Sequence, residues 1–405
     1  MKKAPLILVG LALAVWGATR LFQAELLRER VQRSLERSLN RRVEINGRLD
    51  YKWLTGPGLE VNDVVIHEDP ALGLEPIAYV GALEATPRWL SLLRGRLAFS
   101  TLRLIEPSLN LKRTPSGALN VQPFLEGLFS ARGEAEDLPE IQVRDGRVNF
   151  AEGRRKHVFY LTSTDIDLFP VDASRFNLRI TTEAARTDRP PVSYGSFSAQ
   201  GGLRLLPQSA PEIDLTLDLD RNALADVLLL FEGRRVDLSG RISARTKIAG
   251  PLTDLKIDGR LDLEGFQRWS IPGIKPGAVT LYFTGYADLP RQSVKIGSVM
   301  DSKAGLPVDL RFRAERVFSA PRWGLVVTAR ELPVAVFADI SRATGIPLPE
   351  KFPPAGSGEG GVGLSSAQPR PAGGFLIAVP DAKPYRFELT SAGTTAPIAT
   401  FPARR

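Results

Sequence analysis

The feature that most constrains this chain is the alternation of apolar and polar residues between Val236 and Leu263. Every second residue is aliphatic or small there, and polar residues fill most of the gaps in the run VDLSGRISARTKIAGPLTDLKIDGRLDL. Because successive side chains of a strand point to opposite faces, this alternation predicts β-strands with one apolar and one polar face. Gly240, Gly250-Pro251 and Gly259 punctuate the runs as turn residues, so we expect neighbouring strands to pair as antiparallel hairpins.

The same unit recurs loosely along the chain. A glycine, an arginine and an aliphatic residue lead into alternating runs at Gly47-Arg48-Leu49, Gly95-Arg96-Leu97, Gly146-Arg147-Val148, Gly240-Arg241-Ile242 and Gly259-Arg260-Leu261. Repetition of one strand-turn-strand unit indicates a sheet that lengthens by addition. The alternative is coincidence, because Gly-Arg pairs are common at turns of an arginine-rich chain. We count about 16 strand runs, which at about 4.8 Å per strand predict a sheet on the order of 75 Å long.

The apolar positions of these runs are the candidate binding residues. We expect one continuous apolar face formed by Leu102, Leu104, Leu109, Leu111, Tyr160, Ile166, Leu168, Phe176, Leu178, Ile180, Ile213, Leu215, Leu217, Leu219, Val236, Leu238, Ile242, Ile248, Leu255, Ile257, Leu261, Leu263, Val279, Leu281, Phe283, Val308, Leu310 and Phe312. A closed globule would hide such a face by stacking two sheets, whereas an open, curled sheet would leave it free for acyl chains.

The first 22 residues predict a membrane anchor. Met1 to Lys3 are positively charged, and the run from Ala4 to Ala18 is almost entirely apolar, with anchor candidates Leu6, Ile7, Leu8, Val9, Leu11, Leu13, Val15 and Trp16. Since a bilayer core needs roughly 20 residues, the run is short but sufficient if Arg20 snorkels. The alternative is a signal peptide cleaved after Ala12-Leu13-Ala14. Both interpretations predict that the rest of the chain is exported. If the segment is an uncleaved anchor, the N-terminus lies in the cytoplasm.

Residues 23–42 predict an amphipathic juxtamembrane helix, because Leu27, Val31, Leu35 and Leu39 recur at a spacing of four. The segment 20–52 holds nine basic and five acidic residues, about half of the net charge of +8. Such a basic collar favours anionic lipid headgroups, and its interleaved acids disfavour nucleic acid.

Beyond the anchor we expect an N-terminal β region at 43–130, a repetitive β region at 131–350, and a linker with a final strand at 351–405. Apolar stripes at helical spacing start at Val121, Leu224 and Pro333 and predict short helices that pack on the sheet. Pro, Gly and Ser from Phe352 to Gly374 predict the linker, and the last alternating strand follows at Tyr385, Phe387 and Leu389.

The sequence offers no constellation that supports catalysis. It contains no cysteine and only two histidines, His67 and His157, each alone in a strand-like run. Asp165/Asp167 and Asp214/Asp218/Asp220 place carboxylates on one strand face, but opposite the apolar residues, which indicates a solvated face. Gly358, Gly360 and Gly363 match a dinucleotide fingerprint by letter only, since they lack the strand-to-helix context. We therefore expect no enzyme activity, no metal and no cofactor.

The segment from Val43 to Val121 resembles the N-terminal region of the AsmA-like family of envelope proteins. The matching phrases are GPGLEVNDVVI (56–66), PIAYVGALEATPRWLSLLRGRL (76–97) and FSTLRLIEPSLNLKR (99–113) followed by SGALNV; RDGRVNF and GPLTDLKIDGRLDL resemble it more loosely. The resemblance implies a single-pass inner-membrane protein of a two-membrane bacterium with its bulk in the periplasm. The family is similar to the bridge-like lipid-transfer proteins, but its members are often longer than this chain, so a complete bridge is not implied.

Together these features predict a mainly β fold: a transmembrane helix, then an elongated, curled antiparallel sheet with a few short amphipathic helices. The expected function is binding of phospholipid acyl chains along the apolar face, in aid of lipid transport to the outer membrane or of its lipid homeostasis. The expected partners are membrane phospholipids and possible outer-membrane or other envelope proteins. The rival hypothesis is a scaffold or assembly factor for outer-membrane proteins, which would hold clients at strand edges.

Overall fold

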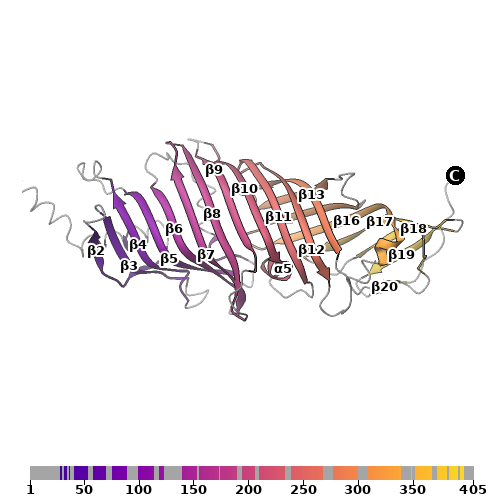
Figure 1. Cartoon of the computed structure of the whole chain (residues 1–405), viewed down its shortest axis with the longest axis horizontal. Helices are drawn as coiled ribbons and strands as arrows, with labels where there is room; N and C mark the ends of the chain where they lie inside the picture. Colours follow the sequence, from indigo (N-terminus) through magenta and orange to yellow (C-terminus); the bar gives the residue numbers. More distant parts are fainter. Residues whose placement is uncertain are drawn as a thin grey trace, which may run out of the picture.

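The described part of the chain folds into one long β-sheet (Figure 1). The computed structural model describes residues 41–52, 58–69, 75–88, 99–113, 118–122, 139–152, 155–172, 174–188, 194–205, 209–232, 239–267, 277–299, 308–338, 348, 352–366, 372–380, 383–390 and 393–395, together with residues 28, 29, 32, 33 and 36. Within these ranges, twenty strands belong to a single sheet, as the repeated alternation predicts.

The strands follow the sequence in order, and one α-helix with defined bounds, α5 (Leu224–Glu232), follows β10. The strands are β1 (Val43–Ile45), β2 (Leu49–Lys52), β3 (Gly58–Ile66), β4 (Ala78–Pro87), β5 (Phe99–Arg113), β6 (Glu140–Glu152), β7 (Arg155–Pro170), β8 (Arg175–Arg186), β9 (Ser196–Arg204), β10 (Glu212–Ala223), β11 (Ser239–Pro251), β12 (Leu255–Gln267), β13 (Gly277–Asp288), β14 (Ser293–Val299), β15 (Val308–Glu315), β16 (Arg322–Pro333), β17 (Ser357–Ser365), β18 (Ala372–Ala378), β19 (Tyr385–Thr390) and β20 (Gly393–Thr395).

Each strand from β3 to β20 pairs with the next along the chain, and β1 and β2 lie end to end along the free side of β3. The pairing is antiparallel except between β5 and β6, which run parallel. The expectation of an entirely antiparallel sheet is therefore wrong at this one point. Parallel neighbours need a crossover connection instead of a tight turn, and residues 114–139 provide its length. At about 4.8 Å per strand the sheet extends about 85 Å.

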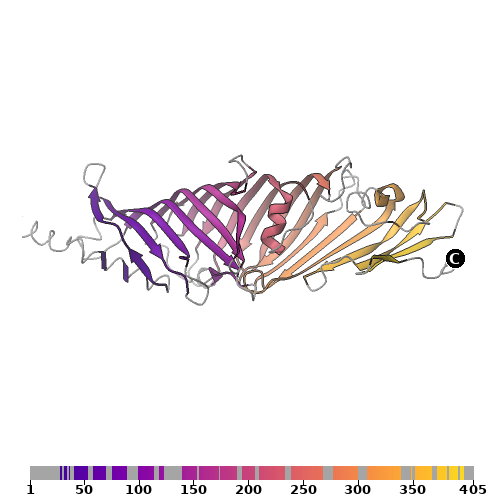
Figure 2. The same cartoon turned by 90° about the horizontal axis from the view of Figure 1, so that it is seen from below.

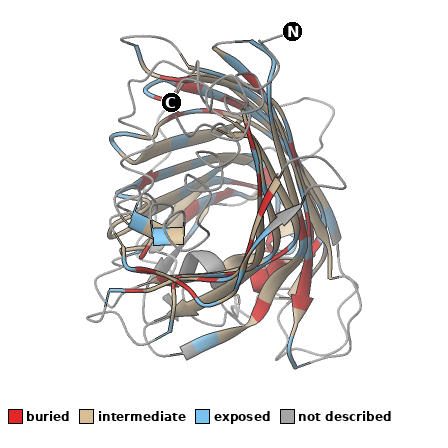
Figure 3. Ribbon diagram, turned by 90° about the vertical axis from the view of Figure 1, so that its left-hand side faces the viewer, coloured by how far each residue is buried: buried red, intermediate tan, exposed pale blue. Residues whose placement is uncertain are grey.

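The sheet is curled along its whole length. Figure 2 shows its two halves, and Figure 3, along the long axis, shows strands that curve around a common interior. A row of irregular positions crosses the N-terminal strands: Asp63, Glu106, Asp145 and Ser163 have positive φ angles on β3, β5, β6 and β7, and Gly81 of β4 is left out of the pairing on both sides. The register itself shifts, as at a β-bulge, where β7 pairs with β6 and with β8. A bulge adds one residue to one strand, which increases the local bend and twist.

Packed cores lie towards the two ends of the sheet and near its middle, where Leu252, Leu255, Ile257 and Ala287 are buried. At the N-terminal end, Val43 and Ile45 of β1 pack with Val61, Val64 and Val80, and all five are buried. At the C-terminal end, a helical turn at residues 334–338 packs onto β16–β18 through buried residues Ala329, Leu332, Val334, Phe337, Phe375 and Ile377. The predicted helices beginning at Leu224 and near Pro333 are thus confirmed, whereas the stripe from Val121 to Leu128 lies largely outside the described residues.

Glycine has a different role here from the one the sequence analysis assigned. Gly146 and Gly259 were expected at turns but lie inside β6 and β12. A Cβ on Gly259 would lie 2.4 Å from Cζ of Phe283, so glycine makes room for a neighbouring ring. The expected linker is also wrong over 357–365 and 372–374, because these residues belong to β17 and β18, paired with each other and with β16 and β19.

The candidate anchor, residues 1–22, lies outside the described part of the chain. Among the described residues, no helix is both long and apolar enough to cross a bilayer.

Candidate functional site

The register of the sheet brings the apolar positions of successive strands onto one face. Leu215 of β10 pairs with Ile248 of β11, which pairs with Ile257 of β12. Further along, Ile296, Phe312 and Leu325 form the corresponding row across β14, β15 and β16. Directly opposed residues of paired strands project to the same side. We call the side that carries these residues, and those in register with them, the apolar face.

Over most of the length of the apolar face, no second layer of described residues covers it. Among the candidate residues that the structure describes, Phe176, Ile242, Leu255 and Ile257 are buried, and all the others are half-buried. On β10, every residue from Leu215 to Leu219 is half-buried. In a stacked β-sandwich the inward aliphatic residues of central strands would instead be buried. Val236 and Leu238 lie outside the described residues.

Exposure also shows which side the curl shelters. The most exposed large apolar and aromatic residues of the strands lie on the polar face. Tyr286 (57% exposed) and Leu376 (49% exposed) are examples. Their neighbours Ala287 and Ile377, on the apolar face, are 6% and 0% exposed. Side chains on the concave side of a curved sheet converge and shield one another, so the apolar face is the inside of the curl.

Tyr160 is a correction to the predicted set. The bulge at Ser163 shifts the alternation of β7 by one residue, so Tyr160 pairs with Ala185 and lies on the polar face. There the guanidinium carbon of Arg147 stands 3.9 Å from the centre of its ring. Phe159 takes the inward position instead, is 4% exposed and stacks on Phe150 with ring centres 5.7 Å apart.

Several residues of the apolar face escaped the sequence analysis. Those on β16 and β18 lie in alternating runs that could have been detected in the sequence. On β6 a bulge interrupts the alternation, and on β9 glycines take some of the apolar positions. In register with the candidates are Ile141, Val143, Val148, Phe150, Phe159, Phe197, Leu203, Ile296, Leu325, Val327, Val362, Phe375 and Ile377.

The opposite face carries ion pairs between neighbouring strands and along single strands. Nζ of Lys247 lies 3.3 Å from Oδ1 of Asp214, and Arg245 pairs with Asp218. Both carboxylates are among those predicted to occupy a solvated face, and this prediction is confirmed. The polar face therefore presents paired charges to water, whereas the apolar face carries mainly aliphatic and aromatic side chains.

The carboxylates of β12 show how these pairs affect ionisation. Partial burial acts to raise the pKa of Asp262, but hydrogen bonds from Arg260 and Thr280 outweigh it and hold that pKa below its ordinary value. A hydrogen bond from the Thr284 hydroxyl, with help from Lys256, lowers the pKa of Asp258. Carboxylates held in the ionised form in this way act as ion-pair partners and are poor proton donors at neutral pH.

Within the described ranges, no group of three or more His, Cys, Asp or Glu residues is arranged to hold a metal ion. His67 at the end of β3 has its Nε2 2.9 Å from Oε2 of Glu44 on β1, which places this histidine in a single pair between two strands.

Comparison with known proteins identifies the family to which the N-terminal half belongs. Residues 1–205, which end with β9, match the AsmA family. Neither the curated proteins nor the solved structures contain a match to this chain. The family match spans half of the 405 residues and includes the phrases at 56–113 that suggested the resemblance. The chain is a member of the AsmA family.

Proposed function

We propose that this protein binds phospholipid acyl chains along the apolar face and aids lipid transport to the outer membrane, or the lipid homeostasis of that membrane. In this proposal it is anchored in the inner membrane by residues 1–22, with its sheet in the periplasm. The observation that carries the proposal is the long apolar face left half-exposed inside the curl. Membership of the AsmA family supports a role in the cell envelope.

The energetics favour an acyl chain as the occupant. Each CH₂ group moved from water onto an apolar surface gains about 0.8 kcal/mol. An aliphatic face attracts hydrocarbon without directional bonds, so a bound chain would slide from one strand to the next at little cost. The sheet, about 85 Å long, supports passage over part of the distance between two membranes.

The rival function is an assembly factor that holds outer-membrane proteins by adding their strands to its own edges. Only the terminal strands have a free edge within the described sheet, and β1, β2 and β20 comprise three, four and three residues. Very short edge strands are a common protection against pairing with other chains. These edges therefore favour the lipid proposal over the rival.

Site-specific photocrosslinking in cells tests the proposal. A benzophenone amino acid at Leu281 of the full chain, on the apolar face, should form adducts with phospholipid that mass spectrometry identifies. The matched control is the adjacent Tyr282, which lies on the polar face and is 36% exposed. Equal lipid labelling at both positions, or none at Leu281, would refute binding along the apolar face. Protein adducts from a probe at Thr394 of β20, without lipid at Leu281, would favour the assembly factor.

A further inference from the structure

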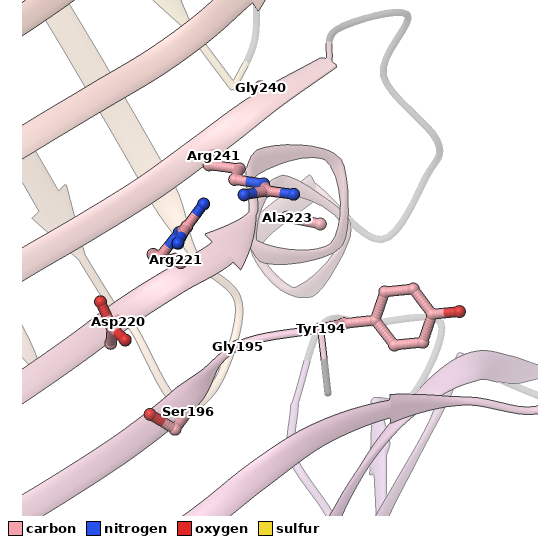
Figure 4. A pocket seen from close by; sticks show the side chains of 8 residues that line it. All are labelled: Tyr194, Gly195, Ser196, Asp220, Arg221, Ala223, Gly240 and Arg241. Atoms are coloured by element: carbon pink, nitrogen blue, oxygen red, sulfur yellow. The ribbon is translucent and has the colours of Figure 1, made fainter. Parts of the chain in front are cut away.

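A pocket of about 470 Å³ opens at the rim of the sheet where β9 and β11 begin and β10 ends (Figure 4). Its lining includes two arginines, Arg221 and Arg241, together with Asp220, Ser196 and Tyr194. Figure 4 shows the two arginine side chains extending from neighbouring strands into the same space, beside the first turn of α5. Two cations on adjacent strands at an open rim form a site suited to an anion.

These arginines differ from others on the same face. Arg245, four residues along β11 from Arg241, pairs with Asp218, and Arg260 on β12 pairs with Asp262. Among the residues that the structure describes, neither Arg221 nor Arg241 has a carboxylate partner or a side-chain hydrogen bond. Unpaired guanidiniums keep their donors free for a ligand.

The backbone of β10 is bent to produce this arrangement. Arg221 has a φ of 47°, and the pairing with β11 shifts between Leu219 and Asn222. The amide of Arg221 donates a hydrogen bond to Oγ of Ser243, 2.9 Å away, which ties the bulge to β11. An arginine in the left-handed backbone conformation costs of order 1–2 kcal/mol, so contacts with the surrounding residues must stabilise this conformation.

We propose that this pocket binds the phosphodiester group of a phospholipid whose acyl chains lie on the apolar face; this inference rests on the proposed function. Two guanidiniums match the oxygens of a phosphate geometrically. With Asp220 the pocket carries one net positive charge, equal and opposite to that of a phosphodiester. Leu219 of the apolar face precedes Arg221 by two residues, so a lipid with its phosphate in the pocket would pass its acyl chains around the rim onto the apolar face.

The test measures binding to the full chain purified in detergent. The probes are dihexanoylphosphatidylglycerol, dihexanoylglycerol, which lacks the phosphate, and inorganic phosphate. The double variant Arg221→Gln/Arg241→Gln is compared with Arg245→Gln, a control on β11 whose guanidinium lies outside the pocket. The single variant Arg241→Gln, together with circular dichroism of all variants, guards against a folding defect caused by the change at the bulge.

We expect the double variant to bind dihexanoylphosphatidylglycerol at least about tenfold more weakly, because charge-assisted hydrogen bonds are lost. Its affinity for dihexanoylglycerol should stay unchanged. Arg245→Gln should bind both lipids with the affinity of the wild-type chain. Wild-type affinity of the double variant for the phospholipid would overturn the inference. If inorganic phosphate binds as tightly as the phospholipid, the pocket is a site for free anions. This result would also overturn the inference, but it would leave the proposed lipid binding on the apolar face intact. If neither lipid binds the wild-type chain, the proposed function itself fails.

Discussion

At the scale of single residues, the bulges decide which side chains face the inside of the curl. Ser163, with a φ of 48°, moves Tyr160 to the polar face and turns Phe159 inward. Asp63, Glu106 and Asp145 shift the alternation of their strands at neighbouring positions. Since these changes of alternation lie at neighbouring positions on adjacent strands, the apolar face stays continuous across them.

Also at this scale, Asp262 allows a test of the polar face. Because the pKa of Asp262 is lowered in the folded chain, its ionised form stabilises the fold at pH values above 3.8, its pKa in the unfolded chain. This contribution is lost as the pH falls through the lower pKa of the folded chain. Asp262→Asn should therefore reduce the free energy of unfolding by roughly 0.5 kcal/mol near pH 7, and the deficit should shrink towards pH 3. Urea denaturation at the two pH values measures it. A deficit that is the same at both would contradict this role for the carboxylate.

At the scale of elements, α5 is attached to the sheet by a buried ion pair. Asp226, in the first turn of α5 and 4% exposed, pairs with Nη1 of Arg186 at the end of β8. Arg186 also donates to both carboxylate oxygens of Asp188, each at 2.8 Å. Hydrogen bonds with Asp188, and the charge of Asp226, raise the pKa of Arg186 despite its burial.

Removing the buried partner should release the helix. Asp226→Ala leaves a largely buried guanidinium with one carboxylate, and we expect a local loss of about 3 kcal/mol. Hydrogen exchange measured by mass spectrometry should then rise in α5 and at the end of β8. Asp188→Ala is the control, because its carboxylate is 37% exposed and its loss should cost less than about 1 kcal/mol. Similar exchange in the two variants would mean that the buried pair does not attach the helix.

At the scale of the whole molecule, the main contacts run between consecutive strands, so stability should be local along the sheet. Phe337 is 5% exposed and meets the Phe375 ring edge-on, with centres 4.9 Å apart. Phe337→Ala should cost about 3–5 kcal/mol in the C-terminal core and increase hydrogen exchange in β16–β18. β3–β7 should stay protected, and Val326→Ala, on the polar face of β16 and 46% exposed, should change little. Loss of protection in β3–β7 would instead indicate one cooperative unit.

The sequence by itself determined the mainly β fold, the existence of an apolar and a polar face, and α5, because alternation and helical spacing are local properties. It also sufficed to identify the family from phrases within 56–113. Only the tertiary structure decided that β5 and β6 run parallel, that glycine-rich β17 is a strand, and that Arg221 and Arg241 meet in one pocket. The physical reason is that register, bulges and the space over a glycine depend on hydrogen bonds and side chains of neighbouring strands, which local alternation does not encode.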